Sequence, residues 1–276
     1  MSIDLNAIRN RLKSLQTTTT KRKNLWKPEP GKTRIRIVPY AFNKDNPFVE
    51  LFFHYNIGKK SYVSLETFGE ADPICEFSEK LKQTGSKDDW TLGKKLEPTL
   101  RTFVPIIVRG KEKEGVKFWG FGKQIYQEIL SIMSDPDYGD ITDPTTGRDI
   151  EIEYLTPQEA GNTYGKTTIR VKPNQQACTD DKDVLDLIVN KQEDINDVYK
   201  RSTYDELKEA LEKWLDPDND EEATESTTDA PGKDEPETDE EVSDKPATKK
   251  ATTNTSSATK VDDVTKAFDT LFNKKK

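Results

Sequence analysis

Apolar side chains stand at every second position in four stretches of this chain, with Arg, Lys or aromatic side chains between them. The stretches cover residues 33–38, 100–109, 116–121 and 166–172. Because successive side chains of a β-strand point to opposite faces, each stretch predicts a strand that buries one row and offers the other to a partner.

Cations interleaved with flat rings suit a single nucleic-acid strand, whose phosphates need charge and whose bases need a stacking surface. We predict base stacking by Phe103, Trp119 and Phe121. An ordinary sheet face also carries Lys and Arg, and most strand aromatics are core residues, so packing is the alternative for each ring. The predicted phosphate contacts are Arg34, Arg36, Arg101, Arg109, Lys117, Arg170 and Lys172.

The remaining patterns predict more strands and a few helices. Further strands are expected at residues 48–56, 60–66 and 149–154, and helices at 74–83, 122–134 and 203–215. Short strands with a helix between some of them predict a mainly β fold with helices (α+β). We expect a partly open barrel of the oligonucleotide-binding (OB) type.

Charge divides the 276 residues into a basic front and an acidic rear. The net charge is −8, and residues 216–276 carry all of it, with 17 acidic and 9 basic residues. The first 60 residues hold 13 Lys and Arg against 4 Asp and Glu. We therefore predict an N-terminal arm over residues 1–24, a binding core over 25–215 and an acidic tail over 216–276.

The arm and the tail each combine a helical pattern with a polar stretch. Apolar residues from Ile3 to Leu15 have helical spacing and are followed by four threonines and Lys21-Arg22-Lys23. Residues 216–248 contain 14 Asp and Glu and too few apolar side chains to fold, so we predict disorder. A terminal helix near 261–272 is marginal alone, so we expect it to fold on a partner. Its contact residues would be Phe268, Leu271 and Phe272.

Sequence motifs of catalysis are missing, and the chain has one histidine, so we predict no enzymatic activity. The aspartates of residues 135–143 lie among Pro and Gly, which favours turns over a metal site. His54 and Cys75 are zinc-ligand types, and Glu66, Glu70 or Asp72 could complete a weaker set. A buried Cys and a hydrogen-bonded His are the favoured alternative, so no cofactor is predicted.

Two cysteines cannot build a disulfide framework, and the sequence shows no signal peptide and no apolar run long enough to span a membrane. A reducing cytoplasm is therefore the expected location.

Several segments carry a family resemblance. Residues 28–66, with Thr-Arg-Ile-Arg-Ile-Val-Pro followed by His54, resemble the start of the core of the single-stranded DNA-binding proteins of T-even-type phages. Residues 103–108 and 116–126 resemble that family's successive strands and the helix after them, and residues 204–211 its last core helix. The resemblance extends over about residues 25–248.

The resemblance implies an OB fold, cooperative coating of single-stranded DNA, and roles in phage replication, recombination and repair in the host cytoplasm. By position, it implies base stacking by Trp119 and Phe103 and a protomer contact near Lys21, Arg22 and Lys23. It places the family's zinc positions at His54, Ser64, near Asp72 and at Cys75, of which only His54 and Cys75 match. The tail would bind replication and recombination proteins.

We therefore predict a non-enzymatic protein that binds single-stranded DNA with little sequence preference. The alternative is an interaction adaptor whose acidic tail is the active part and whose sheet face binds another acidic protein.

Overall fold

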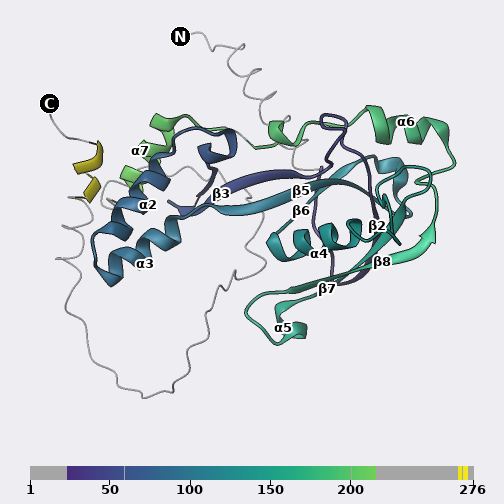
Figure 1. Ribbon diagram of the computed structural model, residues 1–276, viewed down its shortest axis with the longest axis horizontal. Coiled ribbons are helices and arrows are strands. Elements are labelled where there is room, and N and C mark those ends of the chain that lie inside the picture. The colour runs from purple at the N-terminus through teal and green to yellow at the C-terminus, as the bar shows by residue number, and fades with distance from the viewer. Residues whose placement is uncertain (1–23, 59, 200, 216–266, 269, 273–276) are drawn as a thin grey trace, which may run out of the picture. The chain divides into compact units, whose positions relative to one another are not determined.

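The computed structural model describes residues 24–58, 60–199, 201–215, 267–268 and 270–272 (Figure 1). Internal contacts divide these residues into two units. The first comprises residues 24–51 and 100–199, and the second comprises 52–99 and the described residues from 201 onward. The predicted arm, except Asn24, and the acidic residues 216–266 lie outside the described residues.

An open sheet forms the first unit, with the strand order β1-β6-β5-β2-β7-β8. β1 runs parallel to β6, and the other neighbours are antiparallel. Within residues 24–199, β1 and β8 do not pair, so the predicted combination of helices with an open sheet (α+β) is confirmed. The strands are β1 (Leu25–Trp26), β2 (Gly31–Ile37), β5 (Thr99–Val108), β6 (Lys117–Phe121), β7 (Arg148–Leu155) and β8 (Lys166–Gln175).

One face of this sheet packs on α4 (Lys123–Met133), as the predicted alternation requires. Ile125 and Ile129 of α4 join a cluster with Ile35 of β2 and the inward residues of the other strands. These strand residues include Val104, Ile106, Ile150, Ile152, Ile169 and Val171. The period of two therefore identified the inner rows of β2, β5 and β8 correctly.

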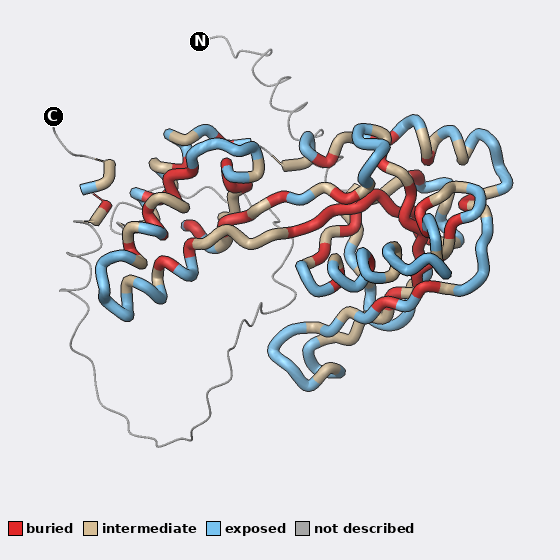
Figure 2. The backbone as a smooth tube through the Cα atoms, in the orientation of Figure 1, coloured by how far each residue is buried: buried red, intermediate tan, exposed pale blue. Residues whose placement is uncertain are grey.

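The opposite face of β5 and β6 is also covered. Ile107 packs with Val38, Cys178 and Ile188, the last from α6 (Lys182–Asn190). Figure 2 shows β5 as a nearly continuous buried run, and residues 101–108 are all buried. A strand covered on both faces is apolar in both rows. These two strands consequently present no solvent-facing row.

Short elements connect the strands of this unit. Two 3₁₀ turns, η2 (Glu112–Glu114) and η3 (Ile195–Asp197), follow β5 and α6. α5 (Pro157–Ala160) lies in the β7–β8 connection and begins at a capping box, in which Thr156 and Glu159 bond each other's backbone N–H.

The second unit packs helices beside a hairpin. β3 (Val49–Ile57) begins in the first unit and pairs in the second with β4 (Lys60–Val63), which is followed by η1 (Leu65–Phe68). Its helices are α2 (Pro73–Gln83), α3 (Lys87–Leu96) and α7 (Tyr204–Leu215). Apolar residues of all three helices share one core cluster. The predicted helices at 74–83, 122–134 and 203–215 correspond to α2, α4 and α7.

α3 was missed because its apolar residues are few and Gly93 interrupts them. A Cβ at Gly93 would lie 2.8 Å from the carbonyl oxygen of Ser78, and the Ser78 hydroxyl donates to the Gly93 carbonyl at 2.7 Å. This glycine thus permits close packing of α3 on α2. In the part of the chain that the structure describes, no helix is long and apolar enough to cross a membrane.

Candidate nucleic-acid interface

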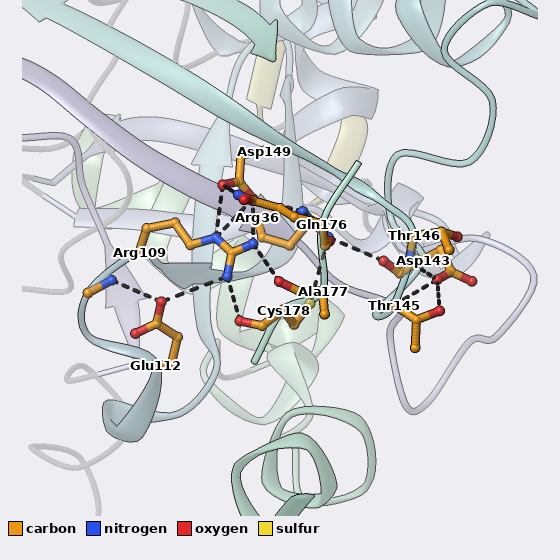
Figure 3. Close-up of polar contacts among 11 residues, drawn as sticks. Arg36, Arg109, Glu112, Asp143, Thr145, Thr146, Asp149, Gln176, Ala177 and Cys178 are labelled. Carbon is orange, nitrogen blue, oxygen red and sulfur yellow. Dashed lines mark hydrogen bonds and ion pairs between the residues drawn. The ribbon is translucent and has the colours of Figure 1, made fainter. Parts of the chain in front are cut away.

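Two of the predicted phosphate contacts form a buried ionic network around Asp149 (Figure 3). Arg36 Nε donates to Asp149 Oδ1 at 3.0 Å, and Arg109 Nε donates to both carboxylate oxygens at 2.9 and 3.0 Å. The side chains of Arg36 and Asp149 are 0% and 1% exposed. Both guanidinium groups therefore share one buried carboxylate.

The same guanidinium groups hold residues 176–178 against the sheet. Arg36 Nη2 donates to the Gln176 carbonyl and Arg109 Nη2 to the Ala177 carbonyl, each at 2.9 Å. Gly147 makes room, because a Cβ there would lie 3.0 Å from Arg36 Nη1. The prediction that Arg36 and Arg109 lie on an open face is wrong, because both are engaged in this network. Arg101 is also buried, at 5% exposure.

The three predicted stacking rings are core residues. Trp119, Phe121 and Phe103 are 2%, 4% and 1% exposed. Trp119 pairs with Val104 in register and packs edge-on against Trp26 at 6.1 Å between ring centroids. The prediction that these rings lie on an exposed face is wrong, because β5 and β6 are covered on both sides.

A glycine within β6 is the signal that could have identified this packing. The Phe103 ring lies over Gly120, where a Cβ would come within 2.6 Å of Phe103 Cε1. The ring also packs against that of Tyr199, with 5.3 Å between the ring centroids. Glycine inside a strand pattern indicates a close approach of this kind, and Trp119-Gly120-Phe121 shows it in the sequence.

Other predicted cations do share one sheet face. Arg34 pairs with Glu151 on β7, and Glu151 pairs with Arg170 on β8, so the three side chains form a row across the strands. Lys32, Glu153, Lys166 and Lys172 lie on the same side by alternation. We call this surface the outer β2–β8 face; it carries Lys32, Arg34, Glu151, Glu153, Lys166, Arg170 and Lys172.

Cations outnumber carboxylates on the outer β2–β8 face by five to two. Lys172 Nζ lies 2.8 Å from Glu151, and this contact lowers the pKa of Glu151. Arg34 and Arg170 are exposed, and among the described residues neither guanidinium forms an ion pair or hydrogen bond. Lys117 lies elsewhere, half-buried on β6 and paired with Glu114. Lys32 and Lys172 pair with Glu153 and Glu151, so among the described residues Arg34, Lys166 and Arg170 are the cations that this face offers to an anionic ligand.

Exposed rings occur where the sequence analysis did not place them. Phe42 is 57% exposed, Tyr164 40% and Trp90 49%. Phe42 and Tyr164 lie in loops of the first unit, and Trp90 lies on α3 with Lys94 Nζ 5.7 Å from its ring centroid. The sequence signal for an exposed ring is an aromatic residue within a run of polar and turn-forming residues. Such a segment stays at the surface, and its ring stays there with it.

His54, Asp72 and Cys75 come together in the second unit, with ligand atoms within 4.8 Å of one another. His54 Nε2 lies 3.2 Å from Asp72 Oδ2, and His54 Nδ1 donates to the Leu96 carbonyl at 2.8 Å. Asp72 caps α2 by accepting from the backbone N–H groups of Ile74 and Cys75. Burial opposes ionisation of Asp72, but hydrogen bonds and the charge of His54 lower its pKa to about 2.

The same residues test the zinc site that the family resemblance implies. A structural zinc ion takes four ligands. Ser64 stands at another of the family's four zinc positions and donates its hydroxyl to Asp72 Oδ2 at 2.8 Å. The same carboxylate oxygen accepts from the Leu65 N–H. Burial raises the pKa of the Cys75 thiol. Three ligand-type side chains meet here, and Ser64 is not among the usual zinc ligands, so the described residues do not complete the four-ligand set of a structural zinc ion. Absence of a cofactor stays a prediction.

The aspartates of residues 135–143 form turns, as expected. Asp143 Oδ1 accepts from the backbone N–H groups of Thr145 and Thr146 at 2.7 Å each. Its hydrogen bonds, the largest from the Thr145 hydroxyl, lower its pKa to about 2. Asp135 and Asp140 make similar bonds to residues two positions on.

Comparison with known proteins identifies the family. A family model described as "gp32 DNA binding protein like" matches residues 29–216, which is more than half of the chain. The chain belongs to this family. The match confirms the predicted resemblance, and the gp32-like chain binds single-stranded DNA. A search of curated proteins found no match.

Proposed function

We propose that this gp32-like protein coats single-stranded DNA cooperatively and with little sequence preference, through an OB-type sheet. It would serve phage DNA replication, recombination and repair in the host cytoplasm. The observation that carries the proposal within the first unit is the row formed by Arg34, Glu151 and Arg170 across β2, β7 and β8.

The outer β2–β8 face would hold the phosphates. Arg34 and Arg170 are exposed, and the five cations lie on β2 and β8, on either side of β7. Each phosphate contact releases counterions from the DNA strand, which gives salt-dependent but sequence-independent affinity. Tyr164, in the connection that leads into β8, would add a ring for base stacking without hydrogen-bond readout.

Replacing either Arg34 or Arg170 by alanine is expected to weaken binding to an oligothymidine and to reduce its salt dependence. On a single strand the log–log slope becomes shallower by about 0.7 for each phosphate that the variant no longer neutralises. Fluorescence-anisotropy titrations over a series of salt concentrations measure this slope.

Lys123→Ala is the matched control, since Lys123 is an exposed cation on α4 away from the face. If Arg34→Ala and Arg170→Ala keep the wild-type slope, phosphates bind elsewhere. Equal binding of polyglutamate and oligothymidine to the wild-type chain would favour the adaptor alternative, because a polypeptide offers no bases to stack.

Cooperativity would come from the basic arm that precedes β1. Deleting residues 2–23 should preserve binding to an oligonucleotide that fits one protomer and abolish clustering on a long strand. The deletion spares Asn24, whose carbonyl accepts from the Phe118 N–H at 2.6 Å. Electron microscopy of partly covered long strands distinguishes clustered from scattered protein. Clustering that survives the deletion would assign the protomer contact to other residues.

Protein partners would bind through the C-terminal tail. Its 14 carboxylates between residues 216 and 248 suit basic surfaces on replication and recombination proteins.

A further inference from the structure

The last described residues pack against the second unit of their own chain. Phe268 is 3% exposed and meets the Phe77 ring of α2 edge-on, with ring centroids 5.9 Å apart. The Phe272 ring lies 4.7 Å from that of Phe268, and Lys208 Nζ of α7 lies 5.2 Å from its centroid. The residues predicted to bind a partner are thus covered by α2 and α7.

The receiving surface is part of the core cluster of the second unit. We call it the α2–α7 surface; it comprises Phe77 and Leu81 of α2 and Leu207, Lys208, Leu211 and Trp214 of α7. Ala267, Leu271 and Phe272 are partly buried against the same cluster. Apolar contacts at i, i+3 and i+4 are the pattern by which an amphipathic helix binds a receptor surface.

We propose that the α2–α7 surface is a docking site for a short amphipathic helix with phenylalanines at i and i+4. Its occupant in the resting protein is the chain's own segment 267–272, which is held reversibly. A helix of this length is not stable alone. The helical structure of segment 267–272 therefore depends on the α2–α7 surface. While docked, Phe268 and Phe272 are withheld from other proteins.

The chain connection favours the protein's own terminus over that of a second copy. Fifty-one residues separate the end of α7 at Leu215 from Ala267, and both ends contact the second unit. A tether of this kind gives an effective concentration of up to about millimolar, above the micromolar concentration of a second chain.

Peptide binding to full-length chains tests the proposal. A fluorescein-labelled peptide of residues 261–276 should bind the Phe268→Ala/Phe272→Ala chain at least about tenfold more tightly than wild type. In the wild type the chain's own segment occupies the surface. Adding Lys208→Glu to the double variant should weaken peptide binding, and a peptide with both phenylalanines replaced should not bind. Equal affinity for wild type and double variant, or binding to neither, would overturn the proposal.

Phe42→Ala is the matched control, because Phe42 is an exposed phenylalanine of the first unit. It should bind the peptide as weakly as wild type does. Circular dichroism of the double variant verifies that it is folded, and hydrogen exchange of wild type should show protection of residues 267–272 that dilution does not remove. A concentration-dependent dimer that the double variant loses would mean exchange between copies and would overturn intramolecular docking.

Discussion

Replacing Asp149 by alanine is expected to lower the free energy of unfolding by about 3–5 kcal/mol. The substitution removes the counter-charge of two guanidinium groups that remain inside the protein, Arg36 at 0% and Arg109 at 15% exposure. It also removes the acceptor of the Gln176 side-chain amide and the carboxylate that orients the two guanidinium groups bonded to the carbonyls of residues 176–178 (Figure 3). Urea unfolding followed by circular dichroism measures the decrease.

Glu151→Ala is the control for this change, because Glu151 lies two residues further along β7 on the outer β2–β8 face and pairs with Lys172. It should cost much less stability and should tighten DNA binding by removing a negative charge from that face. If Asp149→Ala destabilises the protein no more than Glu151→Ala, the buried network contributes little and Arg36 and Arg109 become candidate DNA contacts again.

Replacing Trp119 by alanine is expected to cost about 3–5 kcal/mol of folding stability, the usual range for truncating a buried aromatic side chain. Trp119 is 2% exposed and packs against Trp26 and Phe121, so its removal leaves a cavity in the core. A ring that only stacked on a base would behave differently. Its removal would cost about 1–3 kcal/mol of binding and leave stability unchanged.

Trp90→Ala separates the two cases, since Trp90 is 49% exposed. We expect it to change stability little. Urea unfolding and oligonucleotide titration of both variants, at a temperature where both are folded, give the two free energies. If Trp119→Ala retains wild-type stability and loses affinity, its ring contacts DNA and the packing assignment fails.

Local sequence patterns predicted much of the secondary structure. Period-two alternation located β2, β5, β6 and β8, because the pleat forces every second side chain to one face. Helical patterns located α2, and the structure shows that Asp72 caps it and Pro73 occupies its first turn. The sequence patterns did not predict α3 or α6. Both helices are short, and their apolar residues are few or bounded by polar loops.

Site residues were harder to predict because exposure is a property of neighbours. Arg34 and Arg36 have the same pattern, two positions apart on β2, yet Arg34 is exposed and Arg36 is fully buried. Arg36 is buried because it binds Asp149 and the backbone of Gln176, both more than 100 positions away in the sequence. No local window of the sequence contains both partners.

The sequence by itself determined the family, the strand positions and the basic character of the outer β2–β8 face, because motifs, alternation and charge are local properties. Tertiary structure alone decided which rows are solvent-exposed, since Trp119 joins the core cluster that contains α4 and Phe103 packs against Gly120 and Tyr199. It also decided that Phe268 docks on its own chain. Burial depends on which distant segments meet, and that is set by packing of the whole chain.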